Sequence, residues 1–160
     1  NHRFVFATKN IENLKGIPEE DWQYGENASW LYYLFPNVQL GGGGHDANLI
    51  KIYPDPKNPG RSITKVNHYF SQEFIDYVSQ VPDDGKSAYD KDRNPSLDGV
   101  VEVFDTTIEQ EDYLMGETTQ KSAETGIVKE FIFGRNEPAL HHYHNTFREA
   151  LNLPPLEKVG

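Results

Sequence analysis

Asp112 is the residue of this sequence with the clearest chemical potential. It falls within a helical stripe of mainly apolar residues: Val101, Phe104, Ile108, Met115 and Thr119. The carboxylate of Asp112 is therefore predicted to point inward with those side chains. Burying an unpaired carboxylate is costly, so an inward aspartate needs a cation, strong hydrogen-bond donors or a proton. A bound metal ion would supply the cation, whereas an aspartate at the edge of the stripe would form a salt bridge, and periodicity alone leaves both interpretations open.

Two other groups of residues could do chemistry, and both are weaker candidates. Glu111 and Asp112 are adjacent, but neighbours in a helix diverge by about 100°, so the two carboxylates cannot share one substrate atom. His141 and His144 have the i, i+3 spacing of a metal chelate. No third ligand follows at a recognised spacing and there is no H-E-x-x-H motif, so a packed or solvent-facing histidine group is the favoured interpretation.

The other histidines and the glycine run have simpler interpretations. His68 shares a predicted strand face with Val66 and Phe70, where it would line a cavity or be a satisfied core histidine. His45 follows Gly41–Gly44 in a hairpin loop. The glycines lack a following Lys-Ser or Lys-Thr and lie between extended segments, which excludes a phosphate loop. A G-x-S-x-G elbow and cysteine are both absent, which excludes a nucleophile elbow, disulfides, zinc ribbons and a thiolate-held iron–sulfur cluster in this chain.

These residues would be carried by strands followed by helices. Strands are predicted over four runs: residues 30–35, 38–40, 47–53 and 62–70. Helices are predicted over three segments: residues 72–81 capped by Ser71, residues 97–122, and residues from 137 onward capped by Asn136. Residues 83–95 are predicted to be a loop, and residues 127–133 a short strand or extended connector. Short turns favour antiparallel hairpins, so the pattern predicts an α+β fold with an antiparallel sheet.

Size and charge narrow the function classes. A chain of 160 residues is one domain by size, and its net charge of −10 opposes binding to nucleic acid. No apolar run approaches the roughly 20 residues that span a bilayer, and the first ten residues lack the apolar core of a signal peptide. We therefore expect a soluble, cytoplasmic protein. The only methionine is Met115, so the chain is expected to begin partway through a longer polypeptide.

Three stretches of the sequence resemble the Rieske non-haem iron ring-hydroxylating oxygenases, in the catalytic domain of the α subunit. Residues 104–120, FDTTIEQEDYLMGETTQ, resemble the iron-ligand helix of that family. Residues 133–144 look like its C-terminal stretch, and residues 33–37 resemble its central strand and turn. The resemblance implies a helix-grip, START-like fold, in which a curved antiparallel sheet packs on a long helix. Residues 1–160 would be the C-terminal part of a single, N-terminally incomplete catalytic domain.

The resemblance also implies a metal centre. In the family, two histidines and one aspartate hold mononuclear Fe(II), and Asp112 matches the aspartate. The paired histidines belong to an H-x4-H motif that lies before the region matching residue 1, and no such spacing occurs here. The 2Fe2S Rieske cluster would lie in a missing N-terminal domain. Asp112 is therefore the one metal ligand predicted in this chain, and the chain alone is expected to be inactive.

The resemblance implies further properties of the intact enzyme. It would use dioxygen to hydroxylate an aromatic or related apolar substrate, in the catabolism of aromatic compounds, with electrons from NAD(P)H through a reductase or ferredoxin. It would be a homotrimer. The candidate pocket residues are Ile108, Met115, Val66, His68 and Phe70.

Two other readings of the sequence stay open. One is a non-catalytic helix-grip module that binds a hydrophobic ligand, in which Asp112 would pair with a residue such as Arg135. The other is a small structural subunit of an oxygenase complex.

Overall fold

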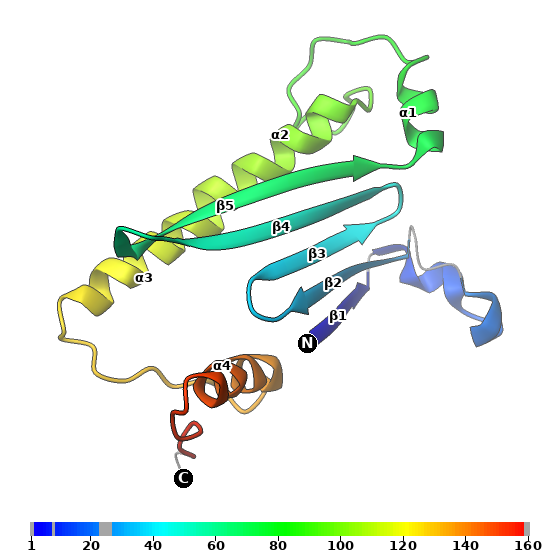
Figure 1. Cartoon of the computed structure of the whole chain (residues 1–160). Coiled ribbons are helices and arrows are strands. Elements are labelled where there is room, and N and C mark those ends of the chain that lie inside the picture. Colours follow the sequence, from blue (N-terminus) through cyan, green and yellow to red (C-terminus); the bar gives the residue numbers. More distant parts are fainter. Residues whose placement is uncertain (1, 8, 23–26, 159–160) are drawn as a thin grey trace.

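A computed structural model describes residues 2–7, 9–22 and 27–158, and its centre is a five-stranded antiparallel sheet. The strands follow one another across the sheet in chain order (Figure 1): β1 (His2–Ala7), β2 (Ala28–Leu34), β3 (Val38–Gly43), β4 (Asp46–Asp55) and β5 (Asn58–Phe70). Two 3-10 turns, η1 (Lys9–Leu14) and η2 (Glu19–Asp21), lie between β1 and β2. The antiparallel hairpins predicted from the sequence are confirmed. β1 lies outside the four predicted runs.

The glycine run belongs to β3, where the sequence had placed the end of the strand. Gly41 and Gly42 pair with both β2 and β4, Gly43 pairs with β4, and the hairpin turns at Gly44, whose φ is 59°. Gly42 has no room for a side chain, because a Cβ there would lie 2.7 Å from the carbonyl oxygen of Asp46 and 2.8 Å from the Trp30 ring. The close approach of these neighbours explains why glycine is needed inside this strand.

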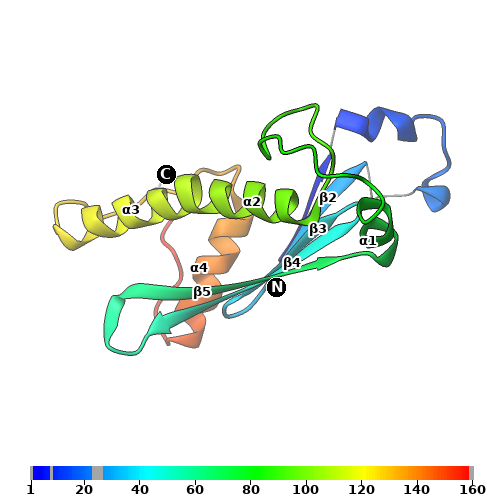
Figure 2. The ribbon, with the colours of Figure 1, turned by 90° about the horizontal axis from the view of Figure 1, so that it is seen from above.

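The helices begin after the last strand. They are α1 (Gln72–Val78), α2 (Leu97–Thr107), the π-helical turn η3 (Ile108–Tyr113), α3 (Leu114–Glu124) and α4 (Pro138–Ala150). Ser71 caps α1 as predicted, because its Oγ accepts a hydrogen bond from the backbone N–H of Phe74 at 3.2 Å. The segments α2, η3 and α3 form one long helix that runs along the sheet (Figure 2). The predicted α+β, helix-grip-like fold is confirmed.

The π-helical turn changes which side chains of the long helix face the sheet. Before the turn, Val101, Phe104 and Ile108 are partly buried, as the predicted stripe requires. After it, Met115 and Thr119 are exposed, and Met115 keeps 64% of its accessible surface. Gly116 and Gln120, each one position later, are exposed as well but line a cavity beside the sheet. A π-turn holds one more residue than an α-turn, so it shifts the helix face that is turned toward this cavity by one residue.

The C-terminal helix α4 packs against the end of β2 through aromatic rings. The ring of Tyr33 lies 4.9 Å from that of Tyr143, and the ring of Phe35 lies 4.9 Å from that of Phe147, both edge to face. The predicted cap Asn136 is wrong by one residue. The N-cap is Glu137, whose Oε2 accepts a hydrogen bond from the Gly134 N–H at 2.7 Å.

The connector before α4 forms no strand over residues 127–133. Ile127 and Ile132 expose 81% and 77% of their surface. The short strand that was one of the two predicted possibilities is therefore absent, and the connector is extended. Within the described part of the chain, no helix has the length and apolar character needed to cross a bilayer.

Candidate functional site

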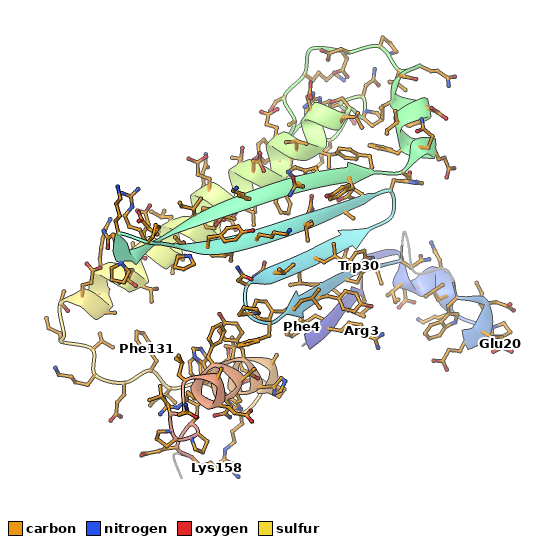
Figure 3. The ribbon with its side chains drawn as sticks, viewed as in Figure 1. Arg3, Phe4, Glu20, Trp30, Phe131 and Lys158 are labelled. Atoms are coloured by element: carbon orange, nitrogen blue, oxygen red, sulfur yellow. The ribbon has the colours of Figure 1, made fainter. Side chains whose placement is uncertain are left out.

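A large cavity lies between the sheet, the long helix and α4. Its volume is about 1190 Å³, and its openness to solvent makes it a cleft more than a closed chamber. The sheet contributes side chains from one face of all five strands: Phe4, Leu31, Tyr33, Gln39, Ile52 and Thr64. Phe4, at the edge strand β1, can be followed in Figure 3. A concave, mainly apolar site between a sheet and its helices is the usual setting for a small-molecule ligand.

The long helix closes one side of the cavity through the last residue of its π-turn and residues of α3. Tyr113, Gly116, Glu117 and Gln120 line the cavity with helical spacing. The carboxylate of Glu117 lies 3.6 Å from Nζ of Lys121, in an exposed i, i+4 pair. Gly116 has no atom within 4 Å of the position of a Cβ. The long helix therefore meets the cavity through one aromatic ring, that of Tyr113, and otherwise through small or polar groups.

Helix α4 supplies an aromatic wall on another side. Tyr143 and Phe147 line the cavity together with Tyr33 of β2, and the Tyr143 and Phe147 rings lie 4.9 Å apart. Burial, with a further contribution from a hydrogen bond to Tyr143, raises the pKa of the Tyr33 hydroxyl. That hydroxyl also donates a hydrogen bond to the backbone oxygen of Pro36. Tyr33 is therefore neutral at physiological pH, and its ring serves as an apolar contact surface and not as a base.

Asp112 lies on the π-helical turn, directly before the cavity residue Tyr113, and it is exposed. The predicted burial of this carboxylate is wrong. All residues from 109 to 132 are exposed, and Tyr113, one position later, lines the cavity in place of Asp112 while keeping 41% of its accessible surface. Among the residues described, no ion pair joins Asp112 to Arg135, the partner considered in the non-catalytic reading. π-helical turns inside α-helices occur frequently at functional sites.

Comparison with protein families identifies the chain's relatives. The family described as ring hydroxylating alpha subunit (catalytic domain) matches residues 6–153. The chain belongs to this family. The match includes all three stretches on which the sequence resemblance rests. In the comparisons with curated proteins and with solved structures, nothing matches significantly.

Membership in the ring hydroxylating alpha subunit family implies iron, so the fit of the residues present can be tested. Within residues 2–7, 9–22 and 27–158, no group of three or more histidine, cysteine, aspartate or glutamate side chains is placed to hold a metal ion. Asp112 offers one carboxylate, whereas the family's facial triad needs three protein ligands. The described residues therefore do not make a complete iron site by themselves.

The other predicted pocket residues of this oxygenase family member lie outside the large cavity. Ile108 lines a second pocket of about 560 Å³, on the side of α2 that meets residues 88–96. His68 is only 14% exposed; its Nε2 lies 3.3 Å from Oδ1 of Asp105, and its ring meets Phe104 edge to face. Val66, His68 and Phe70 are partly buried on one strand face, as predicted. His68 contacts α2, the ring of Phe70 stacks on that of Phe74 in α1, and none of the three lines the cavity that α3 and α4 line.

The histidine group of α4 is packed, which confirms the favoured interpretation for His144. Its ring stacks on Phe133 at 4.6 Å. Burial, followed by the charge of Arg148, lowers the pKa of His144. His45 lies in the β3–β4 turn as predicted, where its ring stacks on that of Phe74 at 5.8 Å.

Sequence reasoning missed most of the cavity. Phe147 and Leu140 stood on the predicted apolar face of the last helix and do line it. Phe4, Tyr33 and Tyr143 were not singled out. A signal was available for Tyr143, which lies one helical turn before Phe147 and so shares its face.

Proposed function

We propose that this chain is the C-terminal portion of a ring-hydroxylating oxygenase α subunit, and that Asp112 is one of three protein ligands of its mononuclear iron. The family match over residues 6–153 carries this proposal. It favours the oxygenase over a non-catalytic carrier or a small structural subunit, because the matching family is that of the catalytic subunit. One feature of the fold supports the assignment of Asp112: it lies on the π-helical turn, a local geometry that is frequent at functional sites.

The part of the reaction that this chain would perform is substrate binding. The aromatic wall formed by Tyr33, Tyr143 and Phe147 can pack against a planar apolar ring, and Leu31 and Ile52 extend the apolar surface. The iron of the intact enzyme would supply the activation of dioxygen. Its two nitrogen ligands and the Rieske cluster would come from polypeptide outside this sequence, with electrons from NAD(P)H through a reductase or ferredoxin. The intact enzyme would be a cytoplasmic homotrimer.

The role of Asp112 is tested by substitution in the intact α subunit that carries this sequence. Asp112→Ala is expected to lower the iron content at the mononuclear site from one per subunit to near zero and to abolish hydroxylation. Glu111→Ala is the matched control, because Glu111 is also exposed on the π-turn and points about 100° away. If Asp112→Ala retains its iron, or if both variants lose iron equally, the assignment is wrong.

A second experiment tests whether the chain is only part of the site. The 160-residue chain, expressed alone, is expected to bind iron well below one equivalent and to consume no oxygen with reductant. Stoichiometric iron or product formation by this chain would contradict the proposal.

A further inference from the structure

We draw no further inference here: the strongest candidate, the pocket of about 560 Å³ between α2 and residues 88–96 that holds the guanidinium of Arg93, carries nothing, because that guanidinium already donates a hydrogen bond to Ser96 and pairs with Glu102, and nothing in the structure shows what would occupy the rest of the pocket.

Discussion

Deleting Gln110 should remove the π-helical turn and leave the rest of the long helix in register. Gln110 is exposed within η3 (Ile108–Tyr113), so no packed side chain is lost. An α-helix turns by about 100° per residue, so a one-residue deletion normally rotates everything beyond it by that angle. Here the turn already contains one residue too many. After the deletion, the helix would continue regularly from Ile108. Gly116 and Gln120, which line the cavity beyond the π-turn, would then still point toward the cavity.

The expected effect on stability is a small gain. Replacing the π-turn by regular i to i−4 bonds improves backbone hydrogen bonding by about 1 kcal/mol. For a domain of this size that corresponds to a rise of about 2–4 °C in melting temperature. Thermal unfolding followed by circular dichroism measures it.

The matched control is deletion of Glu102, an exposed residue in the regular part of α2. The helix is regular at that point, so the deletion rotates the residues on its two sides by about 100° relative to each other. The apolar side chains before and after the deletion can then no longer face the sheet together. Val101 or Phe104, each partly buried, then leaves its site at a cost of about 1–2 kcal/mol. If the two deletions lower the melting temperature equally, the reasoning about helical phase is refuted.

Two further predictions concern stability. Gly42→Ala should lower the free energy of unfolding by about 1–3 kcal/mol, because its Cβ would meet the Asp46 carbonyl oxygen at 2.7 Å. Gly116→Ala, with open space around it, should raise the free energy of unfolding by up to about 1 kcal/mol. Chemical denaturation of both variants measures the difference, and equal effects would contradict the packing at Gly42. The second prediction concerns pH. Burial lowers the pKa of His144 below its unfolded value of 6.5, so the folded state binds fewer protons than the unfolded state. The stability that His144 contributes is therefore present above pH 6.5 and is lost as the pH falls from there through the folded pKa. His144→Gln should make unfolding less dependent on pH in that window, and an unchanged slope would show that His144 is not responsible.

Local chemistry made much of this fold predictable. Strand-forming runs between turns anticipated β2 to β5, and the Ser71 cap with its following apolar spacing anticipated α1. β1 was missed because a strand of six residues is too short to show a clear alternation of apolar and polar side chains. Its pairing with β2 becomes evident only in the structure. Asn136 was chosen as a cap by residue type, but the helix begins one residue later, with Glu137 as an N-cap whose side chain makes no capping hydrogen bond and accepts one from the Gly134 N–H in the preceding connector.

The candidate site was less predictable, because it depends on how distant segments meet. The sequence indicated the helix that carries Asp112, but the extra residue of the π-turn decided that Tyr113 and not Asp112 faces the cavity. Periodicity assumes a constant 100° per residue, so it cannot locate such a turn. The meeting of Tyr33 with Tyr143 likewise depends on α4 crossing the end of β2.

What the sequence determined by itself is the family, through three stretches in the right order, together with the acidic charge and the strand-then-helix order. Only the tertiary structure decided which side chains share a cavity and that Asp112 is exposed. The physical reason is that residue type and local spacing set what each segment can form. The direction of a side chain depends on the accumulated turn of its helix and on packing against segments far away in the chain.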